Sequence, residues 1–91
     1  MHRVLLHPLA HRTLESLDPA IQEAMRKALR TLADAPERGK HLTHSRFWSL
    51  RVGDYRAIYE IVERDQSVVV LFIGHRKNVY ADFSKLRDRW W

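Results

Sequence analysis

The sequence predicts an α+β domain in which one strand and two helices precede a small, mainly antiparallel sheet, followed by a terminal helix. Two observations carry this prediction. Between residues 8 and 35, apolar side chains recur at steps of three and four, which is the helical period. After residue 45, β-branched and aromatic residues form three short runs that indicate strands. A chain of 91 residues is too short for two independent cores, so a single domain, residues 1–91, is expected, with the sheet backed by two helices.

The N-terminal half is expected to be β-α-α. Residues 2–7 (HRVLLH) form a short apolar run that predicts the first strand. Residues 8–17 (PLAHRTLESL) predict a helix, because proline is tolerated in the first helical turn. Asp18 is a suitable N-cap for a second helix, which we expect to run to about residue 35, where Pro36 ends it. The apolar face of this second helix would consist of Ile21, Met25, Ala28, Leu29 and Leu32.

The C-terminal half is expected to be a β-meander with a final helix. Residues 37–45 are polar, basic and contain glycine, so they are expected to form a loop. Strands are expected around residues 46–52, 55–64 and 67–74, because their connections are short. Residues 77–91 have helical composition. Their apolar positions, Val79, Phe83, Leu86 and Trp90, indicate an amphipathic helix.

The turn at residues 53–54 determines which side chains share a face of the sheet. A two-residue turn with Gly53 first fits type II′ and places Arg51 directly opposite Arg56. Like charges directly opposite are destabilising, so this pair indicates an anion, and phosphate is the commonest one. The same face would carry Phe47, Ser49, Ile58 and Glu60, whereas the face packed on the helices would carry Trp48, Leu50, Ala57 and Tyr59. One face is thus expected to be core and the other to collect charge.

The charge balance favours an acidic partner. Sixteen Lys and Arg residues oppose eleven Asp and Glu, and twelve of the sixteen are arginine, whose planar fork matches phosphate oxygens. A pI near 10.1 suits a nucleic acid or an acidic protein. The alternative is a solvated basic surface on which Arg51 and Arg56 pair with Asp54, Glu60 or Glu63.

The composition excludes several kinds of functional site and a membrane span. The chain has no cysteine, so disulfides, thiolate zinc sites and cysteine nucleophiles are ruled out. It has no long apolar run and no signal-peptide pattern, so no membrane span is expected and the cytoplasm is the default compartment. His41 and His44 lack a third ligand, and neither a glycine-rich phosphate loop nor an acidic cluster is present. An enzyme acting on phosphate is therefore expected to work without a metal or other cofactor.

Polar residues gather after the last expected strand. His75 could act as an acid or base or could be an ordinary surface histidine. Arg76 and Lys77 add positive charge at the strand end, where functional residues are held by a rigid scaffold. Tyr80 either packs as an amphipathic aromatic or takes part in a site.

Two segments carry a family resemblance. LRVGDYRAIYEI and IGHRKNVYADF, following two N-terminal helices, closely resemble the RelE/ParE superfamily of toxins from type II toxin–antitoxin systems. The resemblance spans nearly the whole chain and implies a RelE-like, microbial-RNase-like fold and a cognate antitoxin that wraps the toxin. RelE-type members cleave mRNA in the ribosomal A site, and ParE-type members inhibit DNA gyrase.

The resemblance assigns roles to particular residues. Arg56 matches the arginine with which RelE-like toxins stabilise the cleaved phosphate, and Arg76 matches a second such arginine. Tyr80 matches the tyrosine near the scissile group. The lysines that RelE members carry before the turn fall here on Phe47 and Ser49, so they are missing.

Three other residues could compensate for the missing lysines. Arg51 lies on the expected face and could supply positive charge, and His75 or Glu60 could supply proton transfer. Tyr80 would stack on or orient a base.

Lys40, Arg46 and Lys77 are expected to contact RNA.

The predicted function is therefore that of a toxin that cleaves mRNA on the ribosome without metal and blocks translation. Its predicted partners are mRNA, the ribosome and a cognate antitoxin, in a possible hetero-oligomer. Two alternatives stay open: a ParE-like, non-enzymatic inhibitor of DNA gyrase, and an inactive family member that only binds its antitoxin.

Overall fold

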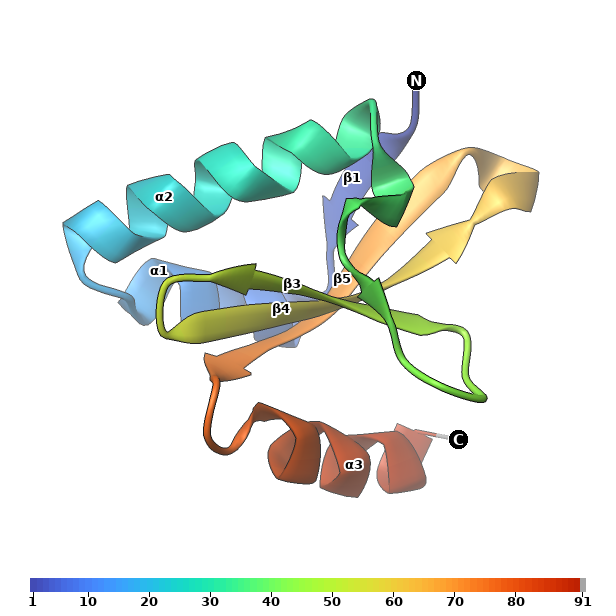
Figure 1. Cartoon of the computed structure of the whole chain (residues 1–91). Helices are drawn as coiled ribbons and strands as arrows, with labels where there is room; N and C mark the ends of the chain where they lie inside the picture. Colours follow the sequence, from blue (N-terminus) through green and yellow to red (C-terminus); the bar gives the residue numbers. More distant parts are fainter. Residues whose placement is uncertain (91) are drawn as a thin grey trace.

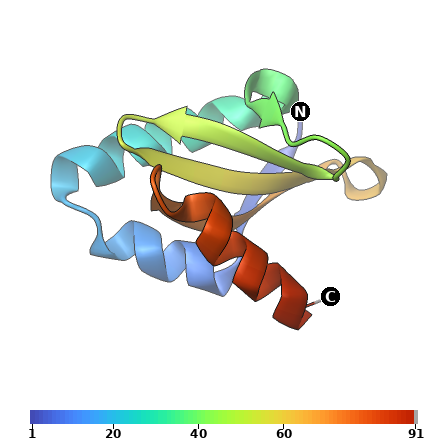
Figure 2. The same ribbon diagram turned by 60° about the horizontal axis from the view of Figure 1, so that its bottom comes forward.

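A mixed β-sheet lies between two helical layers in the computed structural model, which describes the backbone of residues 1–90 and the side chains of residues 1–89. Figure 1 shows α2 above the sheet and α3 below it, and Figure 2 shows α3 crossing the lower face. The order of elements is β1 (Arg3–Leu6), α1 (Pro8–Ser16), α2 (Pro19–Arg30), β2 (Lys40–His41), β3 (Phe47–Val52), β4 (Tyr55–Val62), β5 (Ser67–His75) and α3 (Val79–Trp90). The expected α+β class is confirmed. Trp91 and the side chain of Trp90, part of the apolar stripe expected for the last helix, lie outside the described residues.

Within residues 1–90 the sheet has five strands in the order β1-β5-β4-β3-β2. β1 runs parallel to β5, and the other three neighbouring pairs are antiparallel, as expected for a mainly antiparallel sheet. β1 and β2 are therefore the two edge strands. No helix among the described residues is long and apolar enough to cross a membrane.

The β3–β4 hairpin has the predicted register. Val52 pairs with Tyr55, and Arg51 lies directly opposite Arg56. Gly53 has φ +60°, whereas Asp54 is absent from the positive-φ residues, which is the pattern of a type II′ turn. The turn thus fixes which hairpin residues face α1 and α2 and which face α3.

Both faces of the sheet carry a hydrophobic core. The larger core packs α1 and α2 on residues that include Leu50, Ala57 and Tyr59, as predicted. The expectation that the other face only collects charge is wrong, because Phe47 and Ile58 are buried there under α3. The rest of this second core is Leu71, Val79 and Phe83. The charged part of that face is therefore confined to the end near the turn and to the edges that α3 leaves open.

Two boundaries differ from the sequence prediction. The α-helix of α2 ends at Arg30 rather than near residue 35, because the chain tightens into a 3₁₀ turn over Thr31–Ala33. The expected loop at residues 37–45 contains β2, whose Lys40 and His41 pair with Ser49 and Trp48. A two-residue strand carries no periodicity, so this pairing could not be read from the sequence.

A long-range contact holds β2 in place. The hydroxyl of Tyr59 donates to the carbonyl oxygen of Pro36 at 2.7 Å and accepts from the N–H of Gly39 at 3.0 Å. A Cβ at Gly39 would lie 2.7 Å from the carbonyl oxygen of Ser49, so only glycine allows this close approach. Burial raises the pKa of Tyr59, which keeps its hydroxyl proton available for the bond to Pro36.

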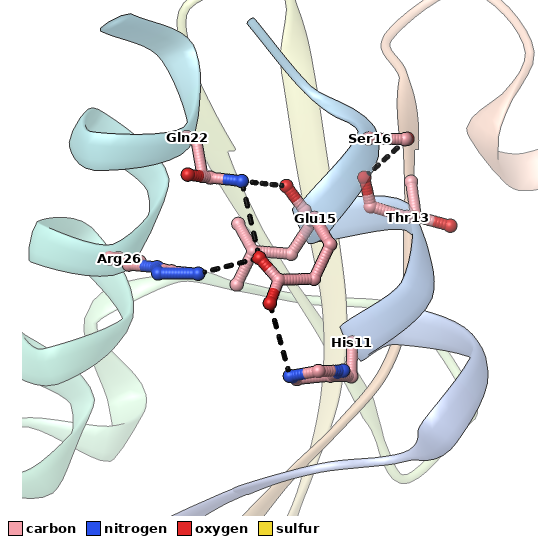
Figure 3. Close-up of polar contacts among 7 residues, drawn as sticks. His11, Thr13, Glu15, Ser16, Gln22 and Arg26 are labelled. Atoms are coloured by element: carbon pink, nitrogen blue, oxygen red, sulfur yellow. Dashed lines mark hydrogen bonds and ion pairs between the residues drawn. The ribbon is translucent and has the colours of Figure 1, made fainter. Parts of the chain in front are cut away.

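A network of polar side chains joins α1 to α2 (Figure 3). The carboxylate of Glu15 accepts from Arg26 at 2.9 Å and from Gln22 at 3.3 Å, and it lies 3.7 Å from the ring of His11. Gln22 also donates to the carbonyl oxygen of Leu14 at 2.9 Å, at the end of α1. The hydrogen bond and charge of Arg26 outweigh desolvation and lower the pKa of Glu15.

This network makes the hairpin of α1 and α2 sensitive to acid. Because the folded-state pKa of Glu15 lies below its ordinary value of 4.5, the pair stabilises the fold above that pH and loses its effect as pH falls through the folded pKa. We expect Glu15→Gln to lower Tm at pH 7, and the difference from wild type to shrink below pH 4.5, as measured by thermal unfolding across pH. Glu23→Gln is the control, because Glu23 faces Arg30 at 3.9 Å with both side chains mostly exposed. An unchanged Glu15→Gln difference at every pH would contradict this role.

Candidate functional site

Three side chains meet on the α3 face of the sheet. The Oγ atom of Ser49 accepts a hydrogen bond from Nη1 of Arg56 at 3.2 Å and another from the hydroxyl of Tyr80 at 3.2 Å. The guanidinium carbon of Arg56 lies 5.9 Å from the centre of the Tyr80 ring, within the range of a cation–π contact. Ser49, Arg56 and Tyr80 are called the Ser49 cluster below. It joins β3, β4 and α3.

Packing at the start of α3 brings Tyr80 to this position. Gly74 pairs with Arg56 in the β4–β5 ladder, so no side chain from β5 stands next to Arg56 on this face. A Cβ at Gly74 would lie 3.2 Å from a methyl carbon of Val79, which is itself fully buried. The missing side chain lets the first turn of α3 approach the sheet closely, and Tyr80 follows directly after this anchor.

The two opposed arginines have no carboxylate partner among the described residues. The Nε of the exposed Arg51 donates to the carbonyl oxygen of Gly53 at 3.0 Å, and the half-buried Arg56 donates to Ser49 and lies over the ring of Tyr80. The three carboxylates that could have neutralised them are paired elsewhere. Asp54 lies 3.4 Å from Arg76, Glu60 lies 3.4 Å from Arg46, and Glu63 lies 2.5 Å from His2. Positive charge on this face is therefore left open to an external anion.

Arg76 lies at the β3–β4 turn. Its backbone N–H donates to the carbonyl oxygen of Asp54 at 2.8 Å, and its Nε lies 3.4 Å from the Asp54 carboxylate. Both side chains are substantially exposed, so water screens this ion pair and a stronger anion can replace it. Arg51 is bonded to the same turn through Gly53. The turn thus carries contacts to two arginines, and the pairing of Arg51 with Arg56 places Arg51 next to the Ser49 cluster.

The structure does not bring His75 or Glu60 into the cluster. His75 pairs with Tyr55, and the two rings lie 5.6 Å apart, so the histidine is on the opposite face from Arg56. Its Nδ1 accepts from the backbone N–H of Lys77 at 3.2 Å. Glu60 shares the face of Arg56 but lies four residues further along β4, which is about 13 Å in an extended strand.

The residues expected to contact RNA surround the cluster at different distances along the sheet. Lys40 is exposed and lies directly opposite Ser49 on the edge strand β2. Arg46 precedes β3 and is engaged with Glu60, and Lys77 is exposed after β5. Lys40 is thus the one of these three that the register places beside the cluster.

Ser49 has a role that no sequence pattern indicates. In the sequence it is a position where a family lysine is missing, whereas in the structure it is the common acceptor for Arg56 and Tyr80, with 1% exposure. The alternation of side chains along β3 correctly predicts that Ser49 shares a face with Arg51 and Arg56. Its burial depends on α3, which packs on that face. Among the described residues, no group of three or more His, Cys, Asp or Glu side chains is arranged to hold a metal ion.

The sequence of the chain matches the model of a known protein family. A family model described as the ParE toxin of the type II toxin–antitoxin system parDE matches residues 4–80. No curated protein matches the chain.

Solved structures show the same fold. The RelBE2 toxin–antitoxin complex from Mycobacterium tuberculosis has a chain that is 33% identical, covering 82% of this chain and 98% of that chain, with a TM-score of 0.75. The archaeal RelE–RelB complex from Pyrococcus horikoshii OT3 is 25% identical over 82% of this chain and 94% of that chain, with a TM-score of 0.72. The isolated RelE toxin of Escherichia coli is 17% identical, covers both chains completely and has a TM-score of 0.75, which speaks for the fold alone.

Removing the shared acceptor should loosen the cluster. We expect Ser49→Ala to destabilise the fold by about 1–2 kcal/mol, because it removes the acceptor that Arg56 and Tyr80 share in partly buried hydrogen bonds. Urea denaturation measures this loss. Ser84→Ala is the control, since Ser84 lies on α3 outside the cluster and alanine favours a helix. Equal stabilities for the two variants would show that the cluster contributes nothing to the fold.

Proposed function

The chain belongs to the RelE/ParE superfamily of toxins from type II toxin–antitoxin systems, and from that membership we propose that it is an endoribonuclease that cleaves mRNA on the ribosome and blocks translation. The observation that carries the proposal is the unpaired positive charge of Arg51 and Arg56 on a face that also presents Tyr80. Arginines held opposite one another without a carboxylate favour an anionic ligand, and the RNA backbone supplies phosphates.

Cleavage of RNA without a metal uses the ribose 2′-hydroxyl as nucleophile against the adjacent phosphate. The transition state carries extra negative charge on the phosphoryl oxygens, and fixed cations stabilise it more than they stabilise the ground state. Arg56 is suited to this role because Ser49 and the Tyr80 ring hold its guanidinium in place. Arg76 would act as the second phosphate ligand after releasing Asp54, and Arg51 would assist.

Tyr80 offers a surface for a nucleobase. The residue is 42% exposed, and its hydroxyl donates to Ser49, which orients the ring. Bases of single-stranded RNA stack on such aromatic side chains. Lys40, Arg46 and Lys77 would contact neighbouring phosphates, and this binding would weaken steeply with salt.

The proposed partners are mRNA, the ribosome and a cognate antitoxin in the cytoplasm. The solved relatives include RelE chains bound to RelB chains. A segment of this chain's antitoxin that is rich in Asp and Glu would complement the net charge of +5 and compete with RNA for the unpaired arginines. Toxin and antitoxin would form a hetero-oligomer.

A second candidate function is inhibition of DNA gyrase. It is favoured by the matching family model, which is that of the ParE toxin, and by the absence of lysine at Phe47 and Ser49. A chain of this family that binds its antitoxin and does no further harm is a third candidate, resting on the same two substitutions.

The arginine site can be tested by single substitutions. We expect Arg56→Ala and Arg76→Ala each to lower the rate of mRNA cleavage by roughly a hundredfold or more, because each removes a fixed cation from the transition state. The measurement is single-turnover cleavage of an mRNA bound to purified ribosomes. Arg12→Ala, an exposed arginine on α1, is the matched control and should cleave at the wild-type rate. Full activity in both Arg56→Ala and Arg76→Ala would remove this site from the proposal.

The target can be identified in a host cell. We expect expression of the toxin to produce new mRNA 5′ ends within translated messages, mapped by sequencing, while purified gyrase supercoils DNA normally in its presence. Blocked supercoiling without new 5′ ends would favour the gyrase inhibitor. Neither effect, with antitoxin binding retained, would favour the inactive family member.

A further inference from the structure

The edge strand β2 adds a lysine to the Ser49 cluster. Lys40 pairs with Ser49 in the antiparallel β2–β3 ladder, and residues directly opposite each other share a face, with Cβ atoms about 4.5–5.5 Å apart. Lys40 is exposed, and no carboxylate lies within ion-pair distance of it among residues 1–89. Its ammonium is therefore available to an anion bound at the Ser49 cluster.

The position of Lys40 is fixed by the chain before it. Gly39 is pressed against β3 so closely that a Cβ there would lie 2.7 Å from the carbonyl oxygen of Ser49. The buried Tyr59 binds both Gly39 and Pro36 through its hydroxyl. A short edge strand would otherwise fray, so this tie keeps the residue after Gly39 in register beside the cluster.

Lys40 brings an ammonium group to the proposed phosphate site, where the hydroxyl proton of Tyr80 is already donated to Ser49. Arginine does not deprotonate in proteins, which removes Arg51 and Arg56 from the role of proton donor. Glu60 is engaged with Arg46, and His75 lies on the other face of the sheet. An ammonium group carries three protons and a positive charge, so it can both attract a phosphate and protonate an oxygen.

We infer that Lys40 is the general acid of the proposed RNA cleavage, an inference that rests on the proposed function. In this step the 2′-oxygen forms a bond to phosphorus, and its proton passes to solvent water. The bond from phosphorus to the 5′-oxygen breaks, its electron pair stays on the 5′-oxygen, and that oxygen takes a proton from the Lys40 ammonium. The products are a 2′,3′-cyclic phosphate and a 5′-hydroxyl, and the neutral amine of Lys40 regains a proton from water.

A change of leaving group separates proton donation from binding. Two mRNAs bound to purified ribosomes are compared, one with the natural 5′-oxygen and one with sulfur in its place at the cleaved bond. A thiolate leaves without protonation, so the sulfur substrate does not need an acid. We expect Lys40→Gln to slow cleavage of the oxygen substrate by roughly a hundredfold or more and to leave cleavage of the sulfur substrate within a few-fold of wild type.

Two further variants sharpen the result. Lys40→Arg keeps the charge but holds its proton, so it should bind the programmed ribosome like wild type and still cleave the oxygen substrate slowly. Lys27→Gln, an exposed lysine on α2 with the same loss of charge, should cleave both substrates at the wild-type rate.

The outcomes distinguish this inference from the proposed function. Equal slowing of both substrates by Lys40→Gln would make Lys40 a phosphate ligand and overturn its role as an acid. Wild-type cleavage of the oxygen substrate by Lys40→Gln would overturn the inference and leave the ribonuclease proposal standing. Failure of the wild-type protein to cleave either substrate would overturn the proposed function, and the inference with it.

Discussion

The register of β3 against β4 determines which side chains lie on each face of the sheet, and a two-residue turn sets this register. Gly53 has φ +60° and no atom within 4 Å of a Cβ built on it, so the backbone conformation rather than space demands glycine there. A shift of β3 by one residue against β4 would move Ser49 and Arg51 from the α3 face to the face of the larger core and leave Arg56, on β4, without them.

The buried Ser49 links the position of Arg56 to the packing of α3. Ser49 has 1% exposure, and its hydroxyl oxygen satisfies Arg56 and Tyr80 together. Because Tyr80 directly follows the buried Val79, the packing of α3 also places the Tyr80 ring beside Arg56. Displacement of α3 would release Arg56 from the ring of Tyr80 and weaken the site without any change in the sheet.

Charged side chains have different roles on the two faces of the sheet. On the α1–α2 side, Glu15 and Arg26 neutralise each other and hold two helices together. On the α3 side, the carboxylates nearest to Arg51 and Arg56 are occupied by other cations, which leaves these two arginines in an unfavourable opposition. Such an arrangement lowers stability in the free protein and increases affinity for any anionic partner, whether a phosphate or an acidic antitoxin.

Local sequence patterns were enough to predict the order of the main elements, the type II′ turn and the opposition of Arg51 and Arg56, because periodicity and turn chemistry are local. The sequence also determined the family, through two segments around the turn and the last strand. Tertiary structure decided the burial of Ser49, the placement of His75 on the other face and the pairing of Lys40 with Ser49. These features depend on a buried helix and on contacts between residues distant in the chain, and no local pattern of side chains encodes such contacts.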